Sequence, residues 1–395
     1  MSTNASPIVI VAARRTPVGS FQGALSGVTA PQLGAKAIAA AVQQAGVKPD
    51  TVDEVIMGCC LMAGLGQAPA RQAAIAAGLG ERTPATTLTK MCGSGMKTVM
   101  LAADMLRAGN GQVYVAGGME SMSQAPYLMP NARAGQRMGP APLLDHMFHD
   151  GLRDAYGGEL MGHYADLCAE RLGFTREEQD TYATESVHRA QAAVESGLFD
   201  PELVPLTVKS GKSEVTVARD ETPLQCKPAK IAQLKPAFRE EGTITAASSA
   251  SISDGAAALV LTREDHAHAH GVRPLARVIA HSTHAQAPAE FALAPIGAIH
   301  KLIERTGWSL HEVDLFEINE AFAVVALAAQ RALNIPHERL NVFGGACALG
   351  HPIGATGARI IVTLINALRQ RGGRRGIASL CIGGGEATAV AIEMC

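Results

Sequence analysis

Aromatic and charged residues are both scarce in this chain, and each shortage limits what the protein can do. Aromatic residues make up 4% of the 395 residues and charged residues 18%, and tryptophan occurs once. The formal net charge is -2 without any block of like charges, which argues against a nucleic-acid surface. No apolar run approaches the ~20 residues that a membrane-spanning helix needs. We therefore expect no nucleic-acid partner and no insertion into a membrane.

Cysteine is present, but not in the patterns that build disulfide frameworks or zinc sites. The eight cysteines are irregularly spaced, and none of them forms a C-x-x-C pair. His266 and His270, four residues apart, are interpreted as an exposed helix end rather than a metal site, so we expect no metal. The N-terminal residues 1–17 have neither the apolar core nor the cleavage site of a secretory signal, which predicts a cytoplasmic protein.

The residues that are abundant predict an α/β fold with a large core. Apolar residues make up 47% of the chain, and there are 41 glycines. Strand-like and helix-like patterns alternate, which favours parallel strands covered by helices. One pattern of helix, strand and adjacent glycines occurs twice, at 96–107, 113–116 and 117–118 and again at 358–369, 377–382 and 383–385. We interpret this as a degenerate internal duplication.

The stretch between the two copies has a different composition, richer in proline and charge. Within it, Thr175 and Glu178 match a capping box, which predicts the start of a long polar helix that Gly197 ends. An apolar pattern resumes at 255–262. We therefore predict an inserted loop subdomain, and the expected domains are 1–120 plus 248–272, 121–247 and 273–395.

The strongest candidate for chemistry is Cys92 in the stretch KMCGSGMK. The glycines at 93 and 95 allow the backbone to turn sharply. Because a helix follows at once, its dipole should lower the pKa of the thiol and make a thiolate available near pH 7. We therefore favour a nucleophile over a buried structural cysteine.

A nucleophilic cysteine needs a base, and His351 is the best candidate. It lies in the stretch GGACALGHPIGATGAR, in the place that Cys92 has in the other copy, so both would face one cleft. Cys381 ends the last apolar strand, where ligand sites of parallel sheets form, although taken alone it is more readily a core residue. Asn319 precedes a helix and is either its N-cap or a group that holds a water or polarises a carbonyl.

Four motifs of this sequence, taken together and in order, resemble those of the thiolases. They are MCGSGMK, GGMESMS, NEAFA with GHPIGATGAR, and CIGGGE. The resemblance covers about residues 7–393 and is greatest to the short-chain biosynthetic group, the acetyl-CoA acetyltransferases. It implies a duplicated five-layered α/β/α/β/α fold with an inserted loop subdomain that binds CoA.

The resemblance also implies a role for each candidate residue. Cys92 resembles the nucleophile that acyl-CoA acylates, and His351 resembles the base that activates it. Cys381 resembles the acid/base that removes the α-proton of a second acetyl-CoA. Asn319 resembles the residue whose bound water forms one oxyanion hole with the His351 ring, and the N–H groups of Cys92 and Gly383 would form the other.

Contacts to substrate and CoA are also carried over from the resemblance. They fall on Met161, Ser249, Ala250, Ser251 and Phe322. The sequence departs from the family pattern at three places, because Ala250 stands for a usual serine, Leu160 for a usual histidine and Phe343 for a usual asparagine. These departures touch CoA binding and the acyl slot more than the chemistry.

The implied function is reversible Claisen condensation of two acetyl-CoA to acetoacetyl-CoA and CoA through an acyl-cysteine. CoA thioesters would be substrates, no cofactor would be bound, and the chain would form a homo-oligomer, either a dimer or a tetramer. One alternative is a thiolase of broader chain length or of a specialised degradation pathway, such as that of β-ketoadipyl-CoA. Another is a non-catalytic lipid carrier with this fold, against which the presence of Cys92, His351 and Cys381 argues.

Overall fold

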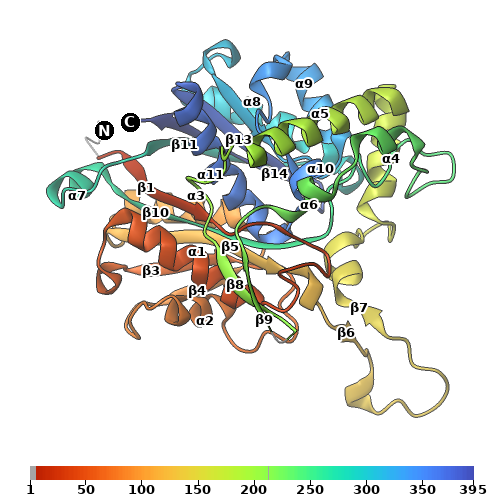
Figure 1. Cartoon of the computed structure of the whole chain (residues 1–395), viewed down its shortest axis with the longest axis horizontal. Coiled ribbons are helices and arrows are strands. Elements are labelled where there is room, and N and C mark those ends of the chain that lie inside the picture. Colours follow the sequence, from red (N-terminus) through yellow and green to blue (C-terminus); the bar gives the residue numbers. More distant parts are fainter. Residues whose placement is uncertain (1–5, 212) are drawn as a thin grey trace.

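The N-terminal half of the fold consists of one sheet region and three helices. The computed structural model describes residues 6–211 and 213–395. Its N-terminal strands are β1 (Ile8–Arg15), β2 (Gly19–Ser20), β3 (Glu54–Gly58), β4 (Ala85–Leu88), β5 (Val113–Ser121) and β10 (Ser253–Arg263), and its helices are α1 (Ala30–Ala45), α2 (Pro69–Ala76) and α3 (Ser94–Arg107). The strands lie in the order β4-β3-β5-β10-β1, with β2 paired to β10 (Figure 1). β3 is parallel to its neighbours, whereas β10 is antiparallel to β5 and β1.

The C-terminal half repeats this topology. Its strands are β11 (Ala276–Ala285), β12 (Leu315–Ile318), β13 (Arg375–Ile382) and β14 (Glu386–Met394), and its helices are α8 (Ala294–Thr306), α9 (Ala323–Leu333), α10 (Ala346–Leu349) and α11 (Ile353–Arg371). Here β12 and β13 are parallel, and β14 is antiparallel to β13 and β11. β1 pairs with β11 at Val9–Arg277 and Ile10–Ala276, which joins both halves into one ten-stranded sheet. The expected duplication is therefore confirmed.

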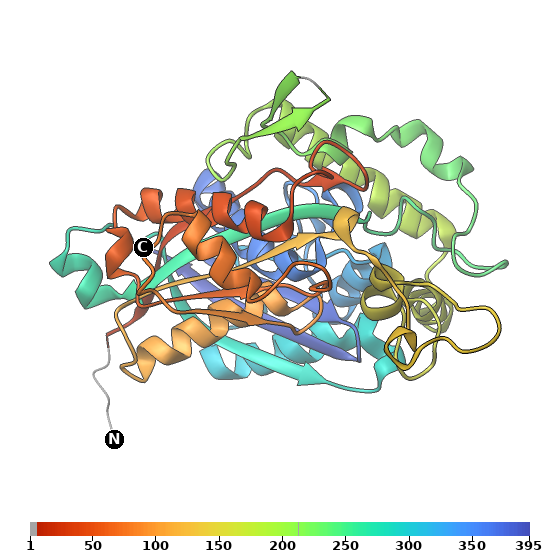
Figure 2. The same ribbon diagram turned by 90° about the horizontal axis from the view of Figure 1, so that it is seen from below.

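Five layers result, because the sheet folds around two central helices. α3 and α11 lie between the two sheet regions and share one core with both, as Figure 1 shows. α1 and α2 cover the outer face of the N-terminal region with a second core. α8 and α9 cover the outer face of the C-terminal region with a third (Figure 2). Each sheet region is thus buried on both faces, which explains the nearly continuous apolar runs of its strands.

The two central helices approach closely where they begin. A Cβ on Gly357 of α11 would lie 2.4 Å from the backbone N of Met96 in α3. A Cβ on Gly95 would lie 2.9 Å from the N of Ala358 and 3.0 Å from the O of Gly354. Only glycine permits this approach, and as a result the starts of α3 and α11 lie side by side.

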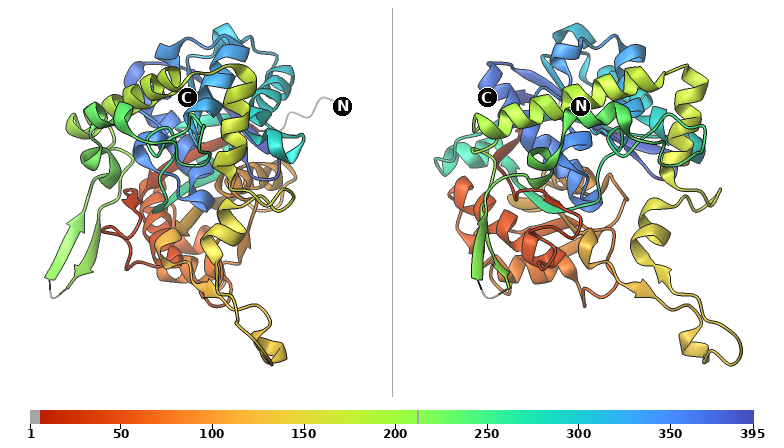
Figure 3. Two further views of the ribbon diagram at one scale, coloured as in Figure 1. Left: turned by 90° about the vertical axis from the view of Figure 1, so that its right-hand side faces the viewer. Right: turned by 45° about the vertical axis from the view of Figure 1, so that its right-hand side comes forward.

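The chain between β5 and β10 forms the inserted region. It contains β6 (Tyr127–Leu128), β7 (Leu144–Asp145), a π-helix (Met147–Leu152), α4 (Met161–Leu172), α5 (Arg176–Glu195), β8 (Leu206–Ser210), β9 (Ser213–Val217) and α6 (Glu221–Gln225). Figure 3 shows the arm that carries β6 and β7 and the hairpin β8-β9 extending away from the layered body. Both parts of the Thr175–Glu178 capping box form at the start of α5, as predicted.

Short helices complete the described part of the chain. They are α7 (Glu264–Ala269) and the 3-10 helices Pro49–Thr51, Met122–Gln124, Ala132–Ala134, Pro228–Gln233, Pro288–Leu293, Leu310–Glu312 and His337–Arg339. Across residues 6–211 and 213–395, no helix combines the length and apolar character needed to cross a membrane.

The predicted strand 113–116 is longer than expected, because it does not end at Gly117 and Gly118. β5 continues through them to Ser121. A Cβ on Gly117 would lie 2.1 Å from the O of Ala257 in β10, and one on Gly118 would lie 2.0 Å from the O of Gly354. These glycines let β10 and α11 pack closely against β5, whereas residues 383–385 form a turn between β13 and β14.

Candidate active site

A small cavity lies where the starts of α3 and α11 meet the end of β13 and the inserted region. Its volume is about 80 Å³. The lining residues are Met91, Cys92, Gly151, Leu152, Met161, Ala250, Phe291, Ala321, Phe322, His351, Ile353, Cys381 and Gly383. The fold thus brings four of the five predicted catalytic residues into one cavity, from segments that are far apart in the chain.

Cys92 lies two residues before the first residue of α3. Burial raises the pKa of its thiol to about 11, against the backbone N–H groups of Gly383 and of Cys92 itself, which lower it. The predicted thiolate near pH 7 is therefore wrong. The reason is that burial outweighs the helix end, so Cys92 is a neutral thiol that needs a base before it can attack.

The turn that carries Cys92 is held in a strained conformation. Met91 has a φ of 46°, in the left-handed region that residues other than glycine and asparagine rarely adopt. The Ser94 hydroxyl donates to the O of Met91 (2.7 Å) and accepts from the N–H of Lys90 (2.7 Å). The Cys60 thiol also lies 3.2 Å from the O of Met91. These contacts fix the backbone on the N-terminal side of the nucleophile.

His351 lies two residues before the first residue of α11 and is 8% exposed. Its Nδ1 is 2.6 Å from the Thr356 hydroxyl, which itself donates to the O of Pro352 (2.9 Å). Because that hydroxyl proton is already used, Nδ1 must carry a proton and donate it, which leaves the lone pair on Nε2. Within the described residues Nε2 has no hydrogen-bond partner.

The protonation state of His351 suits a base. Burial lowers the pKa of its imidazole to about 3, and the positive charge of Arg359 lowers it further. At neutral pH the ring is therefore uncharged, with its free Nε2 able to accept a proton. A buried neutral histidine in one cavity with a partly buried neutral thiol suits general-base activation.

Asn319 is not the N-cap of the helix that follows it. α9 begins at Ala323, and Phe322 occupies the N-cap position. Asn319 instead follows β12 directly and is 1% exposed. Neither its Oδ1 nor its Nδ2 has a hydrogen-bond partner among the described residues. A buried amide without partners is costly, which indicates a site for a water molecule or a ligand oxygen.

Cys381 is the seventh of the eight residues of β13 and is 1% exposed. Burial raises the pKa of its thiol well above the ordinary value, and the neighbouring Cys92 raises it further. Gly383 begins the turn after β13, and its N–H donates toward the Cys92 sulfur. One N–H donor of the C-terminal half thus reaches the candidate nucleophile of the N-terminal half.

The five residues predicted to contact substrate or CoA fall into two groups. Met161, Ala250 and Phe322 line the cavity. Ser249 and Ser251 do not line the cavity. The Ser249 hydroxyl instead donates to the O of Thr245 (2.7 Å), and the Ser251 hydroxyl lies 3.3 Å from the Ser253 hydroxyl.

Sequence patterns missed the apolar wall of the cavity. Leu152 comes from the π-helix, Phe291 from a 3-10 helix and Ile353 from the first residue of α11. Phe291 and Phe238 both pack edge-on against Phe322, with ring centroids 6.2 Å and 5.8 Å apart. None of these residues lies in a periodic pattern that marks it in advance, and only the fold brings them together.

The sequence also gave no role to Glu120, which is fully buried. Its carboxylate accepts hydrogen bonds from the N–H groups of Cys60 (3.0 Å), Leu61 (3.1 Å) and Gly354 (2.9 Å). Gly354 lies in the first turn of α11, so Glu120 ties the helix that follows His351 to the N-terminal half.

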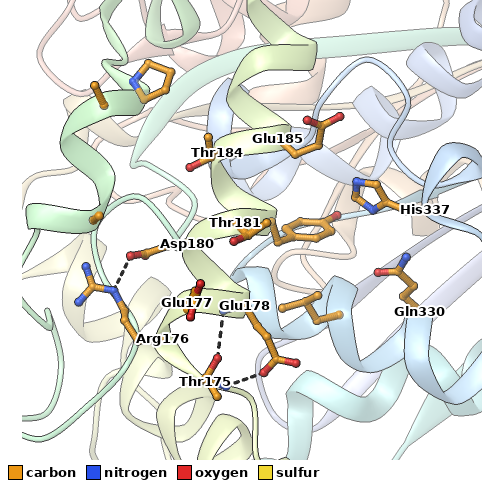
Figure 4. Close-up of a pocket in the computed structure, with 15 residues that line it drawn as sticks. Thr175, Arg176, Glu177, Glu178, Asp180, Thr181, Thr184, Glu185, Gln330 and His337 are labelled. Carbon is orange, nitrogen blue, oxygen red and sulfur yellow. Dashed lines mark hydrogen bonds and ion pairs between the residues drawn. The ribbon is translucent and has the colours of Figure 1, made fainter.

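A larger hollow of about 1360 Å³ lies elsewhere, between α5, α9 and the 3-10 helix Pro228–Gln233. Figure 4 shows that its polar side chains are partly engaged with one another, in the Thr175–Glu178 capping box and the Arg176–Asp180 pair. None of the predicted site residues lines it.

The side chains of residues 6–211 and 213–395 provide no candidate set of metal ligands. No group of three or more His, Cys, Asp or Glu side chains there could hold an ion. The rings of His266 and His270 do lie close, with centroids 4.2 Å apart, but at the end of α7 and away from the cavity.

The duplicated five-layered fold, with a partly buried cysteine and a neutral histidine at the starts of its two central helices, defines a thiol-dependent acyl-transfer protein. Two family models match the chain, Thiolase, N-terminal domain, over residues 8–265, and Thiolase, C-terminal domain, over residues 272–394. The chain belongs to the thiolase family.

Curated relatives and solved structures agree with this assignment. The chain is 48% identical to an acetyl-CoA acetyltransferase of Pseudomonas aeruginosa, covering 98% of each chain. It is also 48% identical to acetyl-CoA acetyltransferase 2 of Arabidopsis thaliana, covering 100% of this chain and 98% of that one. The crystal structure of the Bacillus anthracis acetyl-CoA acetyltransferase superposes with a TM-score of 0.97 at 42% identity, covering 100% of both chains. Acat5 thiolase from Ascaris suum, in complex with coenzyme A, superposes with a TM-score of 0.94 at 38% identity, covering 98% of this chain and 100% of that chain.

Proposed function

We propose that this protein is an acetyl-CoA C-acetyltransferase that condenses two acetyl-CoA reversibly to acetoacetyl-CoA and CoA. The observation that carries the proposal is the pairing of a neutral Cys92 thiol with a His351 whose Nε2 is free, in one cavity with Cys381 and Gly383. The relatives named acetyl-CoA acetyltransferase, at 44% to 48% identity over nearly the whole chain, support the same activity.

In the first half-reaction, Nε2 of His351 takes the proton of the Cys92 thiol, and the sulfur attacks the carbonyl carbon of acetyl-CoA. The carbonyl oxygen becomes an oxyanion, for which the N–H groups of Cys92 and Gly383 are the proposed donors. The bond to the CoA sulfur then breaks, and Cys381 gives its proton to that sulfur. A thiol whose pKa is raised by burial holds its proton at neutral pH, which suits Cys381 to this step as an acid.

In the second half-reaction, the Cys381 thiolate removes an α-proton from a second acetyl-CoA. The resulting enolate oxygen would be stabilised by a water bound between Asn319 and the protonated His351. The enolate carbon attacks the acetyl group on Cys92, the bond to Cys92 breaks, and His351 returns the proton to its sulfur. Protons and bonds balance, and Cys92, His351 and Cys381 end as they began. The unpartnered side chain of Asn319 supports its role here.

The cavity suits a short acyl group. Its volume is about 80 Å³, and Leu152, Phe291 and Ile353 close it with apolar side chains. We therefore expect turnover of C4 3-ketoacyl-CoA to exceed that of C6 to C10 substrates and of β-ketoadipyl-CoA. Steady-state thiolysis rates across this series measure the preference, and faster turnover of any longer substrate would replace the proposed one.

The decisive experiment is mass spectrometry of the protein after brief exposure to acetyl-CoA. We expect one acetyl group, located on the peptide that contains Cys92. Treatment with free CoA should remove it, because transfer between two thioesters is reversible. Absence of the adduct would overturn the enzyme and favour a non-catalytic lipid carrier with the same fold.

We also propose that the inserted region, residues 121–247, supplies most CoA contacts, that no cofactor is bound, and that the protein acts in the cytoplasm as a homo-oligomer, a dimer or tetramer. Exposed apolar side chains on the β6-β7 arm support self-association, since Met138 is 90% and Leu143 63% exposed. Light scattering on the purified protein measures the oligomeric state, and a monomeric mass would contradict it.

A further inference from the structure

Lys90 and Glu386 form an ion pair that joins the two halves of the fold beside the active site. Lys90 lies two residues before Cys92, and Glu386 lies three residues after Gly383. Their side chains are 21% and 34% exposed, so the pair is partly shielded from water. It is the kind of contact whose share of the free energy of folding is small, about 1 kcal/mol or less.

Both partners are attached to backbone that is already fixed. The N–H of Lys90 donates to the Ser94 hydroxyl (2.7 Å), within the strained turn that presents Cys92. Glu386 begins β14 and pairs with Ala285 of β11. The residue before it, Gly385, accepts a hydrogen bond from the N–H of Gln286 (2.9 Å). The ion pair therefore connects two rigid segments rather than two mobile loops.

The two connected segments also touch next to the reacting atoms. A Cβ on Gly93 would lie 2.3 Å from Cδ1 of Ile382, so the backbone after Cys92 lies directly against the residue before Gly383. The N–H groups of Cys92 and Gly383 come from different halves of the fold, and no single element sets the distance between them. On one side Ile382 keeps the segments from approaching, and on the other the ion pair keeps them from separating.

We propose that Lys90 and Glu386 are positioning residues that fix the separation of the Cys92 and Gly383 N–H groups. The proposal rests on the proposed acetyl transfer, in which these two groups bind one oxyanion. Such donors must lie about 2.7–3.1 Å from the oxygen, and a displacement of ~1 Å can cost up to ~10²-fold in rate. An ion pair of little value for stability therefore has a large effect on chemistry.

The test compares Lys90→Met, Glu386→Gln and the double variant with the intact enzyme. We expect kcat for thiolysis of acetoacetyl-CoA to fall about 10-fold in each single variant, with KM within about twofold, because the oxyanion rather than bound CoA is affected. The double variant should be no slower than the single ones. The control is the pair Arg277–Glu264 between β11 and α7, with side chains 33% and 15% exposed, whose variants Arg277→Met and Glu264→Gln should keep kcat unchanged.

Two further measurements separate positioning from a general structural role. The exchanged pair Lys90→Glu with Glu386→Lys should recover kcat to within about threefold of the intact enzyme. The pH midpoint for alkylation of Cys92 by iodoacetamide, followed by peptide mass spectrometry, should rise in the single variants, because the Gly383 N–H that lowers the Cys92 pKa is displaced.

The proposal would be overturned if kcat fell no further in Lys90→Met and Glu386→Gln than in the variants of the control pair. Losses that multiply in the double variant, or an exchanged pair as slow as the single variants, would overturn it as well. If the intact protein does not turn over acetoacetyl-CoA, the proposed function fails instead. The alkylation midpoint then still decides whether Lys90 and Glu386 position Gly383 against Cys92, and an unchanged midpoint would reject it.

Discussion

The two halves of the fold share one topology but place different residues at equivalent positions. α3 and α11 are equivalent, and each begins two residues after a site residue, Cys92 in one half and His351 in the other. β5 and β13 are equivalent as well, because β5 runs parallel to its neighbour β3 and β13 runs parallel to its neighbour β12. After β5, however, the chain inserts residues 122–252, whereas a turn of three residues, 383–385, follows β13. Duplication supplied two helix starts in contact, and divergence placed a cysteine before one and a histidine before the other.

The strand registers extend this comparison to a second pair of residues. Gly58 of β3 pairs with Gly118, and Ile318 of β12 pairs with Ser379. Two residues further along, the equivalent positions are Glu120 and Cys381. Cys381 lines the cavity, whereas Glu120 accepts three backbone N–H groups and lines no part of it. This position thus lines the cavity in the C-terminal half and ties the halves together in the N-terminal half.

The largest expected effect separates the two cysteines. Cys92→Ala should lower turnover by at least about 10⁴-fold and abolish the acetyl adduct, because the acyl group has no acceptor. Cys381→Ala should also abolish condensation but still form the adduct on Cys92, because the CoA thiolate can leave without an acid, whereas the α-proton has no other acceptor. Rapid-quench mass spectrometry measures both, and an acetyl group on Cys381 in Cys92→Ala would reverse the roles assigned to the two cysteines.

Removing the base should change the pH dependence as well as the rate. In the intact enzyme the acylation rate should be flat between about pH 5 and 9, since the pKa values of His351 and Cys92 are about 3 and about 11. In His351→Ala, acylation should be about 10³-fold slower at pH 7. It should then rise about tenfold per pH unit toward 11, since only the thiolate reacts. Stopped-flow acylation from acetyl-CoA tests this, and a variant that stays flat with pH would refute base catalysis by His351.

Glu120→Gln tests the structural side of the same comparison. Its new NH₂ group cannot accept the N–H bonds that the carboxylate accepts, so we expect a loss of about 3 kcal/mol in the free energy of unfolding. Cys381→Ala at the equivalent position should cost about 1 kcal/mol, because it removes only a small buried group. Urea unfolding measures both. Equal losses would mean that Glu120 does not hold the halves together.

The smallest expected effect concerns the contact between the central helices. Gly357→Ala places a methyl group 2.4 Å from the N of Met96, and we expect it to cost about 2 kcal/mol in the free energy of unfolding. Gly27→Ala is the matched control, because nothing lies within 4 Å of its Cβ position, and it should change stability by less than about 0.5 kcal/mol. Thermal unfolding compares the pair, and indistinguishable midpoints would show that α3 and α11 can separate without cost.

Much of the fold and the site could be predicted from local sequence. The capping box at Thr175 uses contacts within one helical turn, so its residues suffice to identify it. Cys92 and His351 stand in glycine-rich stretches that begin helices, and the motifs around them identify the family. The predicted strand 113–116 stops short of Gly117 and Gly118, because these glycines accommodate other segments, the backbone of Ala257 and Gly354, which no local pattern reveals.

The sequence by itself determined the duplication, the family and the candidate reacting side chains, because these depend on residue order and short-range patterns. Only the tertiary structure decided their protonation states. Burial by distant segments makes Cys92 a neutral thiol where its helix alone predicts a thiolate, and a hydrogen bond to Thr356 leaves Nε2 of His351 free. The tertiary structure also decided which parts of the two halves face each other, because the close contact of α3 with α11 exists only once the sheet has folded around them.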